Sequence, residues 1–124
     1  MAYPCQVSCH HMVPEQDTYD SFASLKRGLL EFAVLEVLST ASLYAAEVLD
    51  RLEGTHFATR EGTLYPLFGK LRRDGVLEYE WQESESGPPR KYYTLTAAGR
   101  ERLEQLRATW LELASTLERL GATP

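Results

Sequence analysis

The chain has 124 residues, of which 44% are hydrophobic and 25% are charged, and its formal net charge is −5. This length fits one domain, and the composition is that of a soluble globular protein rather than a disordered one. No run approaches the roughly 18 apolar residues of a membrane span. The start of the chain lacks the basic and apolar segments of a secretory signal. We therefore expect a cytoplasmic protein.

The acidic total conceals a more basic middle segment. Residues 1–57 carry 3 basic and 8 acidic side chains, whereas residues 58–100 carry 7 basic and 6 acidic ones. Two basic clusters occur in this segment, Lys70 with Arg72 and Arg73, and Arg90 with Lys91. Because the local field at a docking surface governs DNA binding, the net charge does not exclude nucleic acid as a partner.

Residues 1–20 are expected to form a flexible tail, because they combine prolines and polar residues without a sustained period. Four potential zinc ligands lie in this tail: Cys5, Cys9, His10 and His11. Their spacing does not match that of structural zinc sites, and the two cysteines cannot form a disulfide framework for the domain. We expect neither a metal site nor a cofactor, although a redox pair of Cys5 and Cys9 is a minor alternative.

Three helices are expected to follow the tail. The first runs from Leu25 to about Ser39 after a cap at Ser24, and its apolar residues recur at spacings of three and four. The second covers about Leu43–Leu52 after a cap at Ser42, with Ala46 facing inward, and ends at Gly54. The third covers about Arg60–Asp74 after a cap at Thr59, and Gly75 provides the stop signal.

A hairpin and a long helix complete the expected order. Strands are predicted at Val76–Trp81 and Lys91–Leu95, joined by a loop over Glu83–Pro89. Thr96 is predicted to cap a final helix that reaches about Leu120. Leucines and one tryptophan recur along this helix at alternating spacings of three and four, which is a heptad seam. The seam consists of Leu103, Leu106, Trp110, Leu113, Leu117 and Leu120.

The fold class predicted from this order is mainly α with a small β-hairpin, arranged as a winged helix-turn-helix domain plus a long C-terminal dimerisation helix. In such a fold the third helix enters the major groove of DNA and the hairpin, or wing, lies along the backbone. We expect residues 21–95 to form the DNA-binding domain and residues 96–120 to form the dimerisation helix.

Two motifs make this interpretation more specific. The run Glu61-Gly62-Thr63-Leu64-Tyr65-Pro66-Leu67, followed by Leu71 and Asp74-Gly75, resembles the third helix of the PadR family of transcriptional repressors. The run from Gly87 to Gly99 resembles the wing of that family and the start of its last helix, and Arg27-Gly28 also fits. The single C-terminal helix resembles the short form of the family. The resemblance implies a homodimeric repressor that binds a palindromic operator and is released by a small aromatic or hydrophobic ligand.

The candidate DNA-binding residues lie on the third helix and the wing. Thr63 near the helix start can reach base edges, Gly62 allows close approach of the backbone, and cationic side chains can neutralise phosphates. The alternative interpretation of each is an ordinary solvated surface residue. The candidates are Arg60, Gly62, Thr63, Tyr65, Lys70, Arg73, Arg90 and Lys91.

The heptad seam is the candidate dimer interface, and it also contains the candidate effector site. Trp110 is wide for a coiled-coil core, so the helices are expected to spread around it and leave an aromatic cavity near the dimer axis. Leu106 and Leu113 are the predicted neighbours in this pocket. Planar hydrophobic ligands, cations in particular, suit such a cavity. Plain dimer packing around Trp110 is the alternative.

Two other classes of function are alternatives to a DNA-binding regulator. One is a winged-helix protein-interaction module that dimerises without binding DNA, which a salt-dependent shift of duplex DNA would exclude. The other is an enzyme, which we do not expect because no nucleophile–base pair, phosphate loop or paired carboxylates occur in a motif context.

Overall fold

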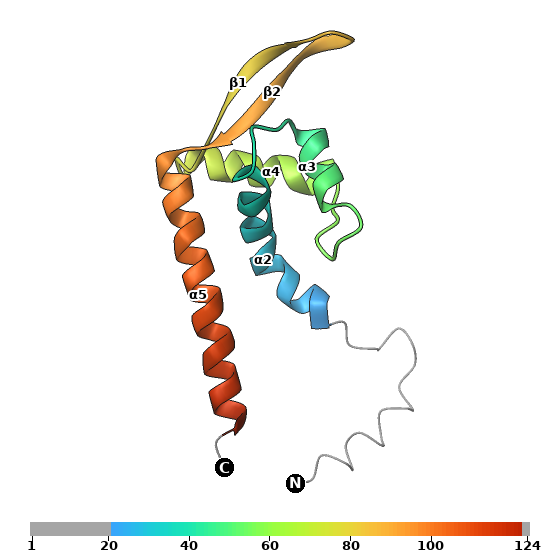
Figure 1. Ribbon diagram of the computed structural model, residues 1–124. Coiled ribbons are helices and arrows are strands. Elements are labelled where there is room, and N and C mark those ends of the chain that lie inside the picture. The colour runs from blue at the N-terminus through green and yellow to red at the C-terminus, as the bar shows by residue number, and fades with distance from the viewer. Residues whose placement is uncertain (1–20, 123–124) are drawn as a thin grey trace, which may run out of the picture.

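The computed structural model describes residues 21–122, and the predicted N-terminal tail lies outside these residues. The elements follow the expected order: α2 (Ser21–Leu38), α3 (Ala45–Leu52), α4 (Glu61–Arg73), β1 (Leu77–Ser84), β2 (Gly87–Leu95) and α5 (Ala97–Ala122). The fold is therefore a winged helix with a long C-terminal helix, as predicted. Helices α2, α3 and α4 pack together, the wing projects from one end, and α5 extends away from the wing (Figure 1).

One apolar core holds the three helices, the base of the wing and the first turns of α5 together. Its side chains come from every element, because each helix buries one stripe and the hairpin buries one face. Burying a large aliphatic or aromatic side chain contributes about 1.5–3 kcal/mol. The most deeply buried side chains are Val34, Leu35, Leu38, Val48, Leu64, Phe68 and Leu71.

The starts of the helices differ from the sequence prediction. Helix α2 already includes Ser21, so Ser24 lies inside it and does not cap it. Helix α3 begins at Ala45 rather than near Leu43, because Leu43 forms an isolated antiparallel bridge with Tyr93 that keeps this segment extended. Ala46 is exposed and does not face inward as predicted, because the buried face of α3 carries Ala45, Val48 and Leu52.

The predicted caps Ser42 and Thr59 were also wrong. The Ser42 hydroxyl instead accepts a hydrogen bond from the hydroxyl of Thr94 at 3.0 Å. Arg60 occupies the N-cap position of α4 without a side-chain cap. Both stop signals were correct, because Gly54 and Gly75 adopt positive φ angles of 81° and 79° just after their helices.

The wing is longer and its loop shorter than predicted. Strands β1 and β2 pair from Leu77 opposite Leu95 to Ser84 opposite Gly87, so only residues 85 and 86 separate them. A register irregularity between Gln82 and Ser84 absorbs one residue near the tip. The additional pairs extend the wing well beyond the core (Figure 1).

The junction between the wing and α5 is rigidly built. The Thr96 hydroxyl accepts a hydrogen bond from the Gly99 backbone N–H at 3.0 Å and donates one to the Gly75 carbonyl at 2.7 Å. Thr96 therefore caps α5, as predicted, and also ties it to the end of α4. Gly99 lies against the backbone of Val76, where a Cβ atom would clash with the carbonyl oxygen.

Candidate nucleic-acid interface

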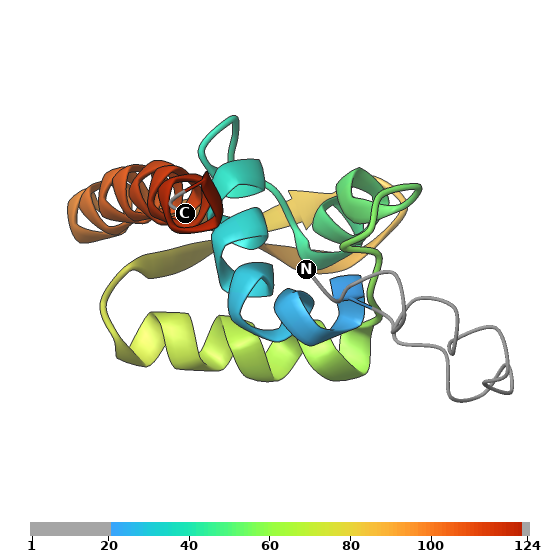
Figure 2. The ribbon, with the colours of Figure 1, turned by 90° about the horizontal axis from the view of Figure 1, so that it is seen from below.

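Helix α4 exposes the face that the sequence assigned to DNA. Its apolar stripe is buried in the core, and the side chains of Arg60, Thr63, Lys70 and Arg73 are exposed. Viewed from below, α4 lies along one edge of the molecule, on the opposite side of α2 from the C-terminal end of α5 (Figure 2). Its outer face is therefore open to a long ligand.

Gly62 lies in the first turn of α4 with open space around it. A Cβ atom at this position would meet no heavy atom within 4 Å, so packing inside the chain does not require a glycine here. Glycine also lowers helix stability relative to alanine by up to about 1 kcal/mol. A glycine that packing does not explain is consistent with close approach of an external molecule to the backbone.

An ionic cluster fixes one of the predicted cations. The Lys70 ammonium lies 3.2 Å from Asp74 and 3.4 Å from Glu31, and the Arg102 guanidinium lies 3.1 Å and 3.2 Å from the same two carboxylates. Hydrogen bonds from Arg102 and Lys70 lower the pKa of Asp74, and Asp74 in turn raises the pKa of Lys70. The cluster joins α2, the end of α4 and α5.

The arginines at the two ends of α4, Arg60 at the N-cap and Arg73 in the last turn, differ from Lys70 in this respect. Within residues 21–122, neither Arg60 nor Arg73 forms an ion pair. The sequence could not distinguish Lys70 from Arg73, because Glu31 and Arg102 come from helices that are distant in the chain. Of Lys70 and Arg73, Arg73 is therefore the cation that is more available to an external phosphate.

The basic side chains of the wing rest on aromatic rings. The Arg90 guanidinium lies 4.3 Å from the centre of the Tyr44 ring, and the Lys91 ammonium lies 4.5 Å from that of Tyr79. The guanidinium of Arg72, on α4, reaches the wing and lies 4.5 Å from the centre of the same Tyr79 ring. Such contacts hold a cation in place while leaving its charge unneutralised. Arg72 and Tyr44 were not among the predicted site residues, because their roles depend on packing between elements.

A concavity of about 470 Å³ lies between the wing and the start of α4. Arg90 and Lys91 line it from the wing, and Glu61 and Tyr65 line it from α4. The structure therefore brings three of the predicted DNA-binding residues, Tyr65, Arg90 and Lys91, to one hollow. The remaining lining comes from Tyr44, Ala45, Ala46, Trp81, Pro89 and Tyr93.

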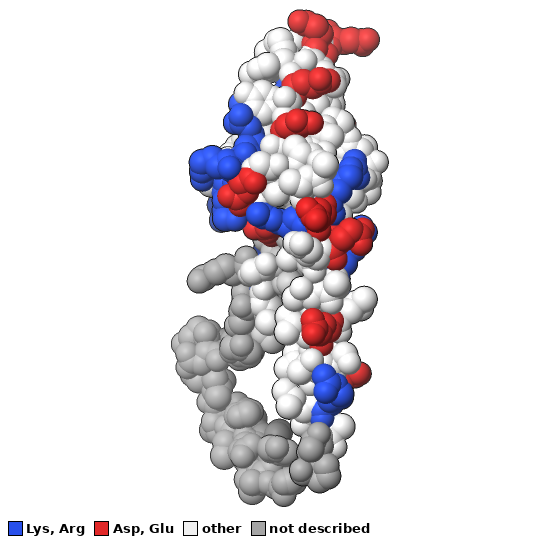
Figure 3. All heavy atoms as spheres, turned by 90° about the vertical axis from the view of Figure 1, so that its left-hand side faces the viewer, with Lys and Arg blue, Asp and Glu red and all other residues white. Residues whose placement is uncertain are grey.

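Acidic side chains follow the other strand of the wing. Glu78, Glu80 and Glu83 on β1 and Glu85 in the turn are exposed. On the face of the molecule that carries α5, acidic side chains continue upward to the wing tip, whereas basic side chains gather lower down at the level of α4 (Figure 3). A phosphate backbone is therefore favoured near α4 and β2 and disfavoured along β1.

The predicted dimer seam is covered by the chain itself only at its start. Leu103 is buried and Leu106 is half-buried against the core. Beyond them, the apolar side chains of α5 are exposed, and Leu117 is 67% exposed. The exposed members of the seam are Trp110, Leu113, Leu117 and Leu120, and Leu111 beside them is also exposed.

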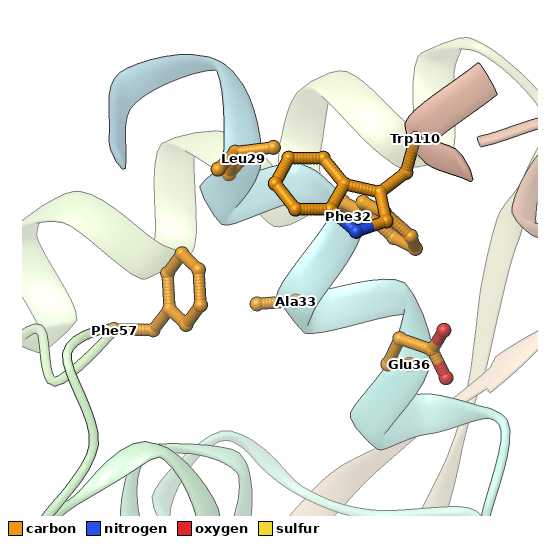
Figure 4. Close-up of a pocket in the computed structure, with 6 residues that line it drawn as sticks. All are labelled: Leu29, Phe32, Ala33, Glu36, Phe57 and Trp110. Atoms are coloured by element: carbon orange, nitrogen blue, oxygen red, sulfur yellow. The ribbon is translucent and has the colours of Figure 1, made fainter. Parts of the chain in front are cut away.

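Trp110 lines an apolar cavity of about 310 Å³ between α2, α5 and the segment after α3. Its indole extends from α5 over Leu29 and Phe32, with Phe57 on the far side (Figure 4). The other two residues predicted for the effector pocket, Leu106 and Leu113, do not line this cavity, which is completed by Ala33 and Glu36. Trp110 turns toward α2, a contact that the heptad spacing does not predict.

The carboxylate at the rim of this cavity is neutralised. The Arg107 guanidinium forms two hydrogen bonds of 2.8 Å with Glu36, and this pairing lowers the pKa of Glu36. The pair fixes α5 against α2 beside Trp110. The rim therefore offers less attraction to a cation than a free carboxylate would.

Comparison with known proteins identifies the chain. The model of the PadR-like family of transcriptional regulators matches residues 34–105, which is more than half of the sequence. The chain belongs to the PadR-like family. It is 41% identical to a PadR-like transcription factor from Bacteroides fragilis, covering 82% of this chain and 99% of that one, with a TM-score of 0.70. A PadR-family regulator from Eggerthella lenta is 31% identical, covering 100% and 99% of the two chains, with a TM-score of 0.73.

Another relative, an uncharacterised protein of Lysinibacillus sphaericus, is 27% identical over 95 residues, which are 74% of this chain and 87% of the relative. As a PadR-like protein, the chain is a DNA-binding transcriptional regulator and not an enzyme. No helix within residues 21–122 is long and apolar enough to cross a membrane. The same residues contain no group of three or more His, Cys, Asp and Glu side chains placed to hold a metal ion.

Proposed function

We propose that this PadR-like protein is a homodimeric repressor whose two winged helices bind the half-sites of a palindromic operator. The winged helix would comprise residues 21–95, and residues 96–120 would form the dimerisation helix. The observation that carries the proposal is the exposed apolar seam of α5. Exposed apolar stripes of this kind mark interfaces, and a two-fold axis would place two copies of the seam face to face.

The two parts of the proposal support each other. Because Thr96 joins α5 directly to the end of α4, the pairing of two α5 helices would set the distance between the two α4 helices. Helix-turn-helix dimers bind half-sites one helical turn of DNA apart, or a multiple of it. An inverted repeat is therefore the expected binding site.

The test uses the full chain and the DNA beside its own gene. We expect sedimentation to give a dimer at micromolar concentration, and nuclease protection to reveal an inverted repeat. The affinity should fall steeply with salt, because phosphate contacts release counterions. If the protein dimerises but binds no duplex DNA at low salt, it is instead a winged-helix protein-interaction module that dimerises without binding DNA.

We propose in addition that a planar hydrophobic ligand binds beside Trp110 and releases the DNA. The aromatic and aliphatic lining of the Trp110 cavity supports this class of ligand, and the Glu36–Arg107 pair weakens the case for a cation. A ligand can change DNA affinity only through its different affinities for two states of the dimer. To test this, the protein is titrated with planar aromatic cations and with phenolic acids, and its tryptophan fluorescence and its release of DNA are both recorded. A Trp110→Phe variant that keeps both responses would contradict the proposed pocket.

A further inference from the structure

We propose that Trp81 on the wing directly contacts the DNA strand that passes between the wing and α4, through the concavity that Trp81 lines. The inference rests on the proposed operator binding and adds a residue that the sequence motifs do not indicate. Trp81 is 60% exposed on the wing and lines the concavity.

The strand register explains why Trp81 faces this concavity. Leu77, Tyr79 and Trp81 alternate along β1 on one face, opposite Leu95, Tyr93 and Lys91. At the base of the wing this face is buried against α4. Trp81 continues the same face beyond the core, so its indole remains exposed. Its ring centre lies 6.1 Å from that of Tyr79, and the Lys91 ammonium lies 5.4 Å from the centre of the indole.

The charges around the concavity favour a nucleic-acid strand in one orientation. Arg90 and Lys91 stand on the wing side, and Glu61 stands on the α4 side. Phosphates would therefore lie against the wing and away from Glu61. The Glu61 carboxylate would face base edges, where it can accept a hydrogen bond from the amino group of cytosine.

The position of the concavity selects DNA as its occupant. The wing extends above α3 (Figure 1), and the concavity is also lined by the start of α4, so it opens beside the helix that carries Thr63 and Arg73. A strand that follows α4 would pass under the wing. An indole provides a flat apolar surface for deoxyribose and base atoms, whereas the neighbouring cations bind phosphate.

The first experiment observes Trp81 directly. The chain contains two tryptophans, so the Trp110→Phe protein carries Trp81 as its only indole. Adding the protected operator duplex at low salt should quench the emission of Trp81 and shift it to shorter wavelength. Unchanged emission at saturating DNA would overturn the inference. A response to polyglutamate but not to DNA would also overturn it, because the occupant would then be an acidic polypeptide.

The second experiment separates the apolar contact from the ionic ones. Trp81→Ala should weaken operator binding by roughly tenfold, with an unchanged slope of log affinity against log salt, because no charge is lost. Trp81→Phe should retain most of the affinity, and Lys91→Gln should reduce the slope by about 1. Gln82→Ala is the matched control, because Gln82 is an exposed neighbour on the same strand that does not line the concavity.

The controls distinguish the two proposals. Thermal unfolding of each variant shows whether a loss of binding reflects a loss of folding. If the wild type binds no DNA, the proposed function fails. If the wild type binds and folded Trp81→Ala binds equally well, the operator function stands and the role of Trp81 is refuted.

Discussion

The ionic cluster at the end of α4 makes Lys70 and Arg73 unequal in DNA binding, although both are exposed cations on the same helix. Lys70 already lies within 3.4 Å of two carboxylates, whereas Arg73 has no ion pair within residues 21–122. A cation that contacts a phosphate contributes about 0.9 to the slope of log affinity against log salt. We expect Arg73→Ala to remove one such contribution and Lys70→Ala to remove much less.

The size of the effect follows from the slope. When the salt concentration is raised fourfold, the operator affinity of both proteins falls. Because Arg73→Ala has lost one phosphate contact, the factor by which its affinity falls should be about 3.5 times smaller than the factor for the wild type. Fluorescence anisotropy with a labelled operator, measured at several salt concentrations, resolves this difference. Because the Lys70 side chain is 52% exposed, its ion pairs are screened by solvent, and Lys70→Ala should change the free energy of unfolding by less than about 1 kcal/mol.

Arg102→Gln provides the matched control for this comparison. It removes the second cation of the cluster without changing the exposed face of α4, so Lys70 should become more firmly held by Glu31 and Asp74. The reasoning would be refuted if Lys70→Ala and Arg73→Ala lowered the salt slope equally while both variants stayed folded. Lys70 would then leave its carboxylates to bind phosphate at no measurable cost.

Three further outcomes follow from the structure. Gly99→Ala should lower the free energy of unfolding by about 1–3 kcal/mol in a denaturant titration, because its methyl group would clash with the Val76 carbonyl. Gly62→Ala should leave the stability of the fold unchanged or raise it by up to about 1 kcal/mol, because the added methyl group has open space around it. The same variant should bind the operator more weakly. An affinity equal to that of the wild type would show that DNA does not approach this part of the backbone. Leu113→Glu combined with Leu117→Glu should give monomers in sedimentation and reduce operator affinity by about 100-fold or more, because two half-sites are no longer linked.

The Glu36–Arg107 pair predicts a dependence of stability on pH. Because the pKa of Glu36 is lowered in the folded state, its contribution is fully present above the ordinary value of 4.5. As the pH falls below 4.5, Glu36 becomes protonated in the unfolded chain before it does in the folded protein. Its contribution to the free energy of unfolding therefore decreases, and it is lost once the pH has fallen below the pKa of the folded state. Glu36→Gln should be less stable than the wild type at neutral pH, and the two proteins should converge in acid. A constant difference in urea midpoint between pH 7 and pH 3 would contradict this assignment.

The sequence by itself determined the order of the elements and the buried face of α4. Apolar residues at three- and four-residue spacing predicted that Leu64, Phe68 and Leu71 are buried, because helical periodicity is a local property. Gly54 and Gly75 marked two helix ends, and Thr96 marked one helix start, because caps act within a few residues. The two PadR-like motifs indicated α4 and the wing as the candidate DNA-binding elements.

Only the tertiary structure decided how those faces are used. The start of α3 depends on a backbone bridge to Tyr93, a residue on a strand distant in the sequence. The difference between Lys70 and Arg73 depends on Glu31 and Arg102, and the exposure of Trp81 depends on how far the wing extends beyond the core. Local patterns can place a charge or a ring on one side of an element. The partner that neutralises or covers it comes from another element, and only packing brings the two together.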